Sequence, residues 1–295
     1  MGDTFQRQGA TAFLQDVWTE AVLNYAEVNY KLRNSITDFT SLTDGNVGEK
    51  VYVPTLGAET AINYTGIDGS SDDASVTFSN DTDGQVEINC NLQPAIGKRI
   101  SNVVQVQASF DIFDGMARSM GQGIAKYIES AIKVYMATDT TNTAVNMSSS
   151  TTVTDAEYEA GVQSAMAILL GKDVPLDDGD LYLYCSPSMY TSLLKSDDFS
   201  HASLRGDSSN PNATGVIGSI YGANVVSSSL WDNGTLADGE VEGTLFHKTS
   251  MGCAFSIEPH VQAQENVAYL STDLVASCCF GASVINGDLI SNIAV

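Results

Sequence analysis

The chain has 295 residues, of which 43% are hydrophobic, and its 36 acidic and 13 basic residues give a formal net charge of −23. Such an acidic surface repels the phosphate backbone of nucleic acids, and the basic residues do not cluster. Generic nucleic-acid binding is therefore disfavoured. No stretch approaches the roughly 18 apolar residues of a membrane span. The N-terminus carries no apolar run, so we expect no signal peptide.

The five cysteines argue against a disulfide framework, because their number is odd, two are adjacent and no CxxC spacing occurs. Cys90 and Cys185 lie in apolar, strand-like runs and are expected to be small core residues. These features favour a protein of a reducing compartment.

The N-terminal part of the chain predicts a helix followed by a short strand. Apolar residues, Trp18 among them, recur at helical spacing within residues 10–33. No partner for this helix lies nearby in the sequence, so it is expected to dock on a distant segment or on another subunit. A strand is predicted from Lys50, with Pro54 expected to end it.

Residues 51–97 are predicted to form an extended two-stranded hairpin. Apolar and polar side chains alternate over 85–92, whereas residues 55–83 are polar and irregular. A hairpin of this length buries too little surface to hold itself, so it is expected to lie on a neighbouring molecule. The aspartates of its polar tip are Asp68, Asp72, Asp73, Asp81 and Asp83.

The longest periodic stretch, residues 109–137, predicts one amphipathic helix of roughly 43 Å, at about 1.5 Å per residue. Gly121 and Gly123 cost such a helix about 1 kcal/mol each, so either another backbone passes close to them or the helix bends. The apolar face is expected to hold Phe113, Met116, Met120, Ile124, Tyr127, Ala131 and Tyr135. The polar face is expected to hold Asp111, Arg118, Gln122, Lys126, Glu129 and Lys133.

After this helix, alternating helices and strands predict an α/β subdomain over residues 154–250. Its first helix is expected to begin at Thr154 and end at Gly171. Strands at 255–264 and 274–280 then return, and they would most naturally pack on the long helix. The α/β subdomain is therefore expected to be an insertion between that helix and its sheet.

No catalytic, cofactor-binding or metal site is predicted. The three histidines lack a second ligand at metal-site spacing, and Cys185 has no histidine nearby in the sequence to activate it. The acidic run 177–180 is similar to the start of a calcium loop, but the position that needs glutamate is Ser188. No glycine-rich phosphate loop is present. These absences argue against an enzyme.

The order of these parts, with GxxVYVPTL at 48–56 and FGASVINGDLISNIAV at 280–295, resembles that of a tailed-bacteriophage major capsid protein of the Hong Kong 97 fold. The passages at 185–194 and 215–226 are similar to the strand–helix–strand passage of that family's axial domain. The resemblance implies an α+β fold with an N-terminal arm, an extended β-hairpin loop (E-loop), a long spine helix with a peripheral-domain sheet, and an inserted α/β axial domain. The implied boundaries are arm 1–50, E-loop and base strands 51–107, spine helix and linker 108–153, axial domain 154–250 and returning peripheral-domain strands 251–295.

The implied function is self-assembly into pentamers and hexamers of an icosahedral shell around a double-stranded DNA phage genome. The shell would form in the bacterial host cytoplasm and become part of the virion, with a portal, no membrane, no cofactor and no sequence-specific DNA binding. Some members crosslink through an E-loop lysine, but residues 51–97 contain neither Lys nor Arg, so no such crosslink is expected. Because the E-loop begins near residue 51, we expect a separate scaffolding protein.

The expected contacts between subunits are electrostatic. We hypothesise that the aspartates of the hairpin tip meet cations or basic groups of a neighbour, such as Arg118 or Lys126, and Trp18 is a further contact candidate. A solvated tip without such contacts is the alternative. Three other functions stay open at this point: an encapsulin-like compartment, a β-rich surface or adhesion protein, and an enzyme built on residues 154–250.

Overall fold

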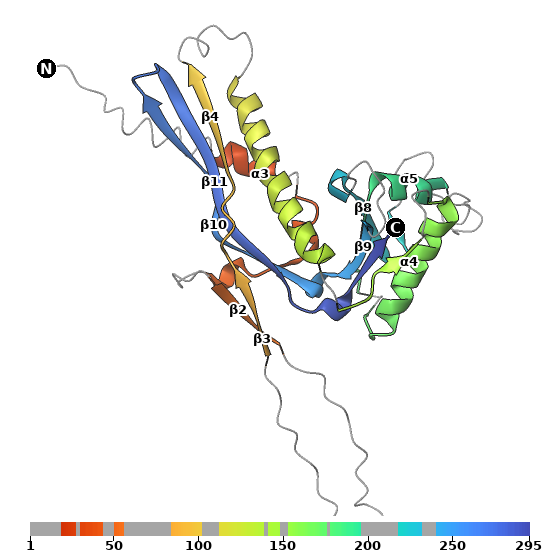
Figure 1. Cartoon of the computed structure of the whole chain (residues 1–295). Helices are drawn as coiled ribbons and strands as arrows, with labels where there is room; N and C mark the ends of the chain where they lie inside the picture. The colour runs from red at the N-terminus through yellow and green to blue at the C-terminus, as the bar shows by residue number, and fades with distance from the viewer. Residues whose placement is uncertain are drawn as a thin grey trace, which may run out of the picture.

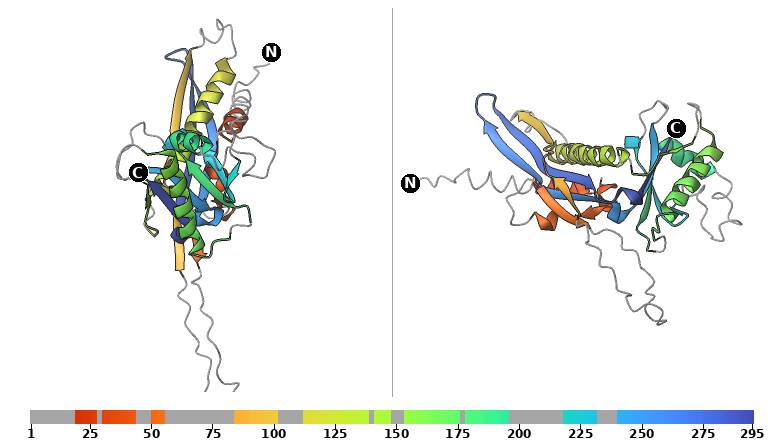
Figure 2. Two further views of the ribbon diagram at one scale, coloured as in Figure 1. Left: turned by 90° about the vertical axis from the view of Figure 1, so that its right-hand side faces the viewer. Right: turned by 60° about the horizontal axis from the view of Figure 1, so that its bottom comes forward.

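The structure, a computed structural model, describes residues 19–27, 30–43, 50–55, 84–101, 112–138, 141–147, 153–175, 178–195, 218–231 and 240–295. These residues form two lobes (Figure 1), one around a four-stranded sheet and one around a six-stranded sheet. The long helix α3 (Ile112–Ala137) lies along the first sheet and reaches the second lobe with its C-terminal end (Figure 2).

The four-stranded sheet is built on a long antiparallel ribbon of β10 (Met251–Asn266) and β11 (Ser271–Val284). The ribbon is flanked by β1 (Thr37–Asp38) beside β10 and by β4 (Ala95–Ser101) beside β11. The predicted strand 255–264 is therefore present, but its alternation is interrupted. The register shifts on both sides of Ile257, and this side chain is exposed instead of facing the core.

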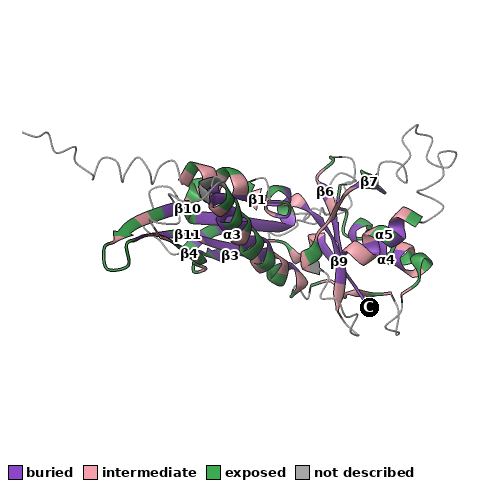
Figure 3. Ribbon diagram, turned by 90° about the horizontal axis from the view of Figure 1, so that it is seen from above, coloured by how far each residue is buried: buried purple, intermediate pink, exposed green. Residues whose placement is uncertain are grey.

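Helix α3 covers one face of this sheet (Figure 3), but its buried face is rotated from the predicted one. Tyr127 and Tyr135, expected to be buried, are exposed, and Glu129, expected in solvent, is 4% exposed. Small and branched side chains let α3 lie closer to the sheet than aromatic rings would. Fully buried on this face are Ala117, Met120, Ile124, Ala125, Ile128, Ile132 and Met136.

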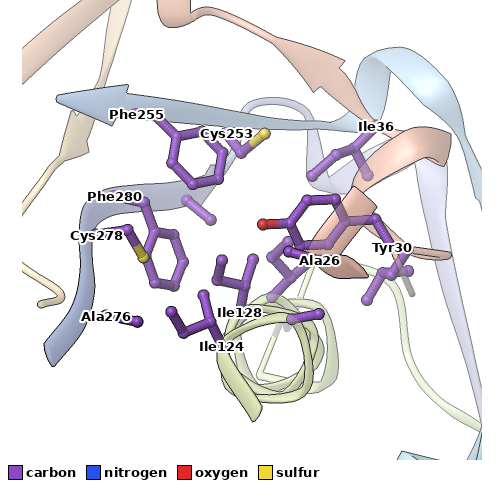
Figure 4. Packing of buried hydrophobic residues seen from close by; sticks show 14 of the residues in the cluster. Ala26, Tyr30, Ile36, Ile124, Ile128, Cys253, Phe255, Ala276, Cys278 and Phe280 are labelled. Carbon is purple, nitrogen blue, oxygen red and sulfur yellow. The ribbon is translucent and has the colours of Figure 1, made fainter. Parts of the chain in front are cut away.

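The core of this lobe also includes the N-terminal segment (Figure 4). Residues 19–27 are helical, and Val22, Ala26 and Tyr30 are buried against α3 and the sheet. Of the two predicted partners, a distant segment or another subunit, residues 19–27 pack on a distant segment of the same chain. At Gly121 a β-carbon would lie 2.7 Å from the Val22 carbonyl oxygen.

Gly121 and Gly123 of α3 are thus explained by close packing. A β-carbon at Gly123 would lie 2.5 Å from Ile96 Cδ1 of β4, so a strand approaches this second glycine as well. Helix α3 runs as one continuous helix without a sharp kink (Figure 2). Of the two predicted explanations, a nearby backbone is observed at Gly121, whereas at Gly123 the close neighbour is the Ile96 side chain.

The six-stranded sheet has the order β5-β12-β9-β6-β8-β7. Its strands are β5 (Val145–Asn146), β6 (Leu181–Cys185), β7 (Ser219–Ile220), β8 (Ala223–Ser227), β9 (Val241–His247) and β12 (Ile290–Ala294). The last strand was expected among the returning strands of 251–295. It instead pairs antiparallel with β9, since the chain crosses back after β11.

Helices α4 (Asp155–Leu170) and α5 (Pro187–Lys195) pack in the second lobe. Thr154 caps α4 in a capping box with Glu157, and Gly171 ends it, as predicted. Short 3-10 helices connect the strands: η1 (Arg33–Ser35), η2 (Thr40–Leu42), η3 (Ser229–Trp231), η4 (Lys248–Ser250) and η5 (Gly287–Leu289).

The base of the predicted hairpin is present as β2 (Lys50–Thr55) paired with β3 (Gly84–Asn89). Pro54 does not end the first strand but lies within it, opposite Gln85, which is possible in a two-stranded ribbon with open edges. The base packs on the first lobe where Gly281 of β11 lets the backbone of Asn89 pass close by. The hairpin tip, residues 56–83, lies outside the described residues.

Candidate subunit interfaces

The residues predicted to contact a neighbour divide into two groups. Asp68, Asp72, Asp73, Asp81, Asp83 and Trp18 lie outside the described residues. Arg118 and Lys126 are both exposed on α3, as predicted. They differ in surroundings, because the Arg118 guanidinium lies 5.1 Å from the Tyr25 ring centre, whereas the Lys126 side chain lines an open cleft.

The most exposed apolar side chains in the described parts of the chain lie at the tip of the β10–β11 ribbon. Val267, Tyr269 and Leu270 are 78%, 67% and 65% exposed. The tip is the far end of the first lobe (Figure 1), and Leu270 has a positive φ of 47°. Apolar side chains gathered at such a position are typical of a protein–protein contact.

A polar clamp holds this tip in place. Arg99 of β4 donates to both carboxylate oxygens of Asp273, at 2.5 and 2.8 Å, and its guanidinium lies 4.6 Å from the centre of the Tyr269 ring. Asn266 donates to the same carboxylate at 3.3 Å. The hydrogen bond from Arg99 holds the pKa of Asp273 below its usual range. Sequence reasoning missed the clamp, because only the strand register brings Arg99 opposite Asp273.

A second polar feature anchors the N-terminal segment to α3. The buried Glu129 carboxylate accepts hydrogen bonds from the backbone N–H groups of Lys31, Leu32 and Arg33, at 2.8 to 3.1 Å. Burial raises the pKa of Glu129, and these three hydrogen bonds partly offset the increase.

An open cleft of about 270 Å³ lies where the two lobes meet. Its lining residues are Lys31, Gln122, Lys126, Glu129, Ser228, Ser229 and Leu230. Two ammonium groups tie the lobes together beside it: Lys31 donates to the Ser227 carbonyl at 3.0 Å, and Lys133 donates to the Leu230 carbonyl at 2.5 Å.

The residues considered for catalysis are either buried or held in contacts with neighbouring side chains. Cys90 and Cys185 are buried, as predicted, and burial raises the pKa of Cys185 to about 12, so its thiol is not poised as a nucleophile. His247 Nε2 lies 2.8 Å from the Asp178 carboxylate of the acidic run. The described residues contain no group of three metal-ligating side chains and no helix suited to span a membrane.

A match to a protein-family model shows to which family the chain belongs. The family model described as phage capsid protein matches residues 97–264, which is more than half of the sequence. The chain belongs to the phage capsid protein family. No curated protein matches it.

Solved structures share the fold. A structure from Mycobacterium phage Che8 has 18% sequence identity and a TM-score of 0.69, covering 88% of this chain and 89% of that one. The capsid structure of the cyanophage P-SCSP1u has 17% identity and a TM-score of 0.69, covering 88% and 86%. A virus-like particle from Pyrococcus furiosus has 14% identity and a TM-score of 0.57, covering 95% and 99%.

These findings confirm the predicted Hong Kong 97-like capsid fold and the prediction of a structural major capsid protein of the virion that is not an enzyme. The alternatives of a β-rich surface protein and of an enzyme on residues 154–250 are wrong, because the family match extends across both lobes. The virus-like particle also shares the fold, and the assignment to the phage capsid protein family rests on the family match.

Proposed function

We propose that this capsid protein assembles into pentamers and hexamers of an icosahedral shell enclosing double-stranded DNA. The observation that carries the proposal is the ribbon tip, where the Arg99–Asp273 clamp holds exposed apolar side chains in a fixed position. A single subunit leaves this surface in water, and contact with other copies would bury it.

The parts of the subunit correspond to distinct roles in this proposal. Residues 1–50 are the N-terminal arm, 51–107 the E-loop with its base, and 108–153 the spine helix and linker. Residues 154–250 are the axial domain and 251–295 the returning peripheral-domain strands, except that we place β12 with the axial domain because it pairs with β9.

The E-loop is proposed to lie on a neighbouring subunit. Its base, β2–β3, is attached to the first lobe. Residues 56–83, between these two strands in the sequence, are the part that we propose to contact an adjacent copy. We propose that Asp68, Asp72, Asp73, Asp81 and Asp83 contact basic groups such as Arg118 or Lys126, with Trp18 as a further contact. Charge reversal at Asp72 and Asp73 is expected to impair assembly while the subunit stays folded.

We further propose that assembly uses a separate scaffolding protein and a portal. The net charge of −23 would keep the shell wall from adhering to packaged DNA. Normal shells formed from this chain alone would contradict the need for a scaffold.

Electron microscopy of the protein, expressed with and without its neighbouring phage genes, tests the shell directly. We expect closed icosahedral particles, and nuclease-protected DNA inside native ones. A protein that stays monomeric under all these conditions would contradict the proposal. Closed particles that hold protein cargo and no DNA would instead favour an encapsulin-like compartment.

A further inference from the structure

We propose that the cleft between α3 and the Ser228–Leu230 segment binds a carboxylate of a second copy of this chain, with the Lys126 ammonium as its principal partner. The inference rests on the proposed assembly into a shell. It selects Lys126 over Arg118 as the group that receives the neighbour, and it names the cleft residues that surround the neighbour's carboxylate.

The cleft offers hydrogen-bond donors for an anionic oxygen. Lys126 is exposed, lines the cleft, and has no hydrogen-bond or ion-pair partner within the described residues. Ser228, Ser229 and Gln122 line the same space. The Ser228 hydroxyl accepts the Leu230 N–H at 3.3 Å, and its own proton can still be donated. Ammonium, hydroxyl and amide groups together match a carboxylate.

Glu129, the acidic residue that lines the cleft, does not already serve as the anionic partner of Lys126. Glu129 lies one turn after Lys126 on α3, but its carboxylate accepts the backbone N–H groups of Lys31, Leu32 and Arg33. Its oxygens are therefore already occupied by backbone donors. Arg118, the other predicted basic contact, already lies against the Tyr25 ring.

The net charge of the chain decides which anion the cleft receives. A surface with 36 acidic and 13 basic residues repels free phosphate and the DNA backbone. In a shell, however, each subunit holds its carboxylates beside its neighbours at a high effective concentration. A tethered carboxylate thus reaches Lys126 where a free anion is repelled.

The position of the cleft gives the contact a mechanical consequence. One wall is α3 of the first lobe, and the other is the segment after β8 of the second lobe. Lys31 and Lys133 already join these walls through the Ser227 and Leu230 carbonyls. A carboxylate bound to Lys126, Ser228 and Ser229 would strengthen the same connection between the lobes.

Zero-length crosslinking tests the inference. Shells are assembled from a mixture of light and 15N-labelled subunits and treated with a water-soluble carbodiimide, which joins a carboxylate and an amine in contact. Within each chain, Lys172–Asp288 at 3.0 Å and Lys50–Glu87 at 2.8 Å are positive controls for the reaction. We expect mass spectrometry to find Lys126 joined to an Asp or Glu peptide of the other isotope.

Two results would overturn the inference, and a third would overturn the proposed function on which it rests. Lys126 could stay unlinked between copies while the two control pairs react in the same shells. It could instead be shielded from acetylation only in DNA-filled particles, which would identify a phosphate contact. If the wild-type chain forms no shells at all, the proposed function fails first, so the two failures are distinguishable.

Variants provide an independent readout. Lys126→Glu is expected to reduce the yield of closed shells at least tenfold without changing the thermal unfolding of the free subunit. Lys126→Arg keeps the charge and should assemble normally. Lys195→Glu makes the same charge change at an exposed position on α5 and serves as the control. Equal yields from Lys126→Glu and Lys195→Glu would contradict the inference.

Discussion

Both carboxylate oxygens of Glu129 accept the backbone N–H of Leu32, at 2.8 and 2.9 Å, across 97 positions of sequence. The same carboxylate also accepts the N–H groups of Lys31 and Arg33. These bonds fix the point where the N-terminal segment joins the core, with Leu32 and Tyr30 buried beside them. A charged residue in the middle of α3 thereby becomes the attachment site of a distant loop.

Removal of this carboxylate is expected to destabilise the subunit. Glu129→Ala leaves buried N–H groups without an acceptor, which costs about 1–3 kcal/mol for each group that water cannot reach. Glu129→Gln keeps one oxygen as an acceptor and should lose less. Chemical denaturation of the unassembled subunit measures both, with the exposed Glu258→Ala as control. Equal losses for Glu129→Ala and Glu258→Ala would contradict the assigned role.

The same residue predicts a pH dependence. Burial is the largest influence on Glu129 and raises its pKa in the folded chain, so folding favours the protonated form. The stability from this group is present at acid pH and is lost as the pH rises through the raised pKa. As the pH rises from acid to neutral, the unfolding free energy of the wild type should therefore fall relative to that of Glu129→Gln. A difference that is constant with pH would contradict this expectation.

Periodicity located α3 in the sequence but not the rotation of its buried face. Gly121 and Gly123 could be identified because glycine in a long helix needs a local reason, and close packing supplies it. The burial of Glu129 could not be predicted, since its partners are backbone groups of a distant segment. The Arg99–Asp273 clamp likewise depends on a strand register joining residues 174 positions apart, which no local pattern contains.

The glycines of α3 give a matched pair of substitutions. Gly121→Ala places a β-carbon 2.7 Å from the Val22 carbonyl oxygen, so helix 19–27 must move away. Gly115→Ala has nothing within 4 Å and should stabilise α3 by about 0.5–1 kcal/mol through helix propensity. Thermal unfolding should shift in opposite directions for the two variants. Hydrogen exchange of residues 19–27 should accelerate only in Gly121→Ala.

The cysteines are expected to differ sharply in reactivity. Burial raises the pKa of Cys185, Cys253 and Cys278 to about 12, and it raises that of Cys90 as well. Only Cys279 is partly exposed. Iodoacetamide at neutral pH should therefore modify Cys279 first in the folded subunit, and all five cysteines after denaturation. Early modification of Cys185, seen by mass spectrometry, would contradict the assigned burial.

The Arg99 clamp is expected to control local order more than global stability. Exposed ion pairs are screened by solvent and contribute little to global stability, so Arg99→Ala should change the melting temperature little. Amide exchange at residues 266–271 should nevertheless accelerate, because Tyr269 loses the guanidinium beside it. The neighbouring exposed Lys98→Ala removes the same charge and is the control. Equal exchange rates at the tip in both variants would contradict the clamp.

The clamp also predicts a response to acid. Arg99 lowers the pKa of Asp273, so the contribution of this pair is present above the unfolded pKa and is lost as the pH falls through the lowered value. After correction for intrinsic exchange rates, protection at the ribbon tip should decrease on acidification in the wild type. It should change much less in Arg99→Ala, where the pair is already absent.

The apolar ribbon tip is expected to act in assembly and not in folding. Val267 is 78% exposed, so Val267→Asp should change the unfolding free energy of the free subunit by no more than about 0.5 kcal/mol. In a contact between copies, the same substitution buries a charge without a partner and should strongly reduce shell formation. Val267→Thr keeps the shape of the side chain and should assemble at intermediate yield. Light scattering and electron microscopy measure the yields, and normal shells from Val267→Asp would exclude the tip as a subunit contact.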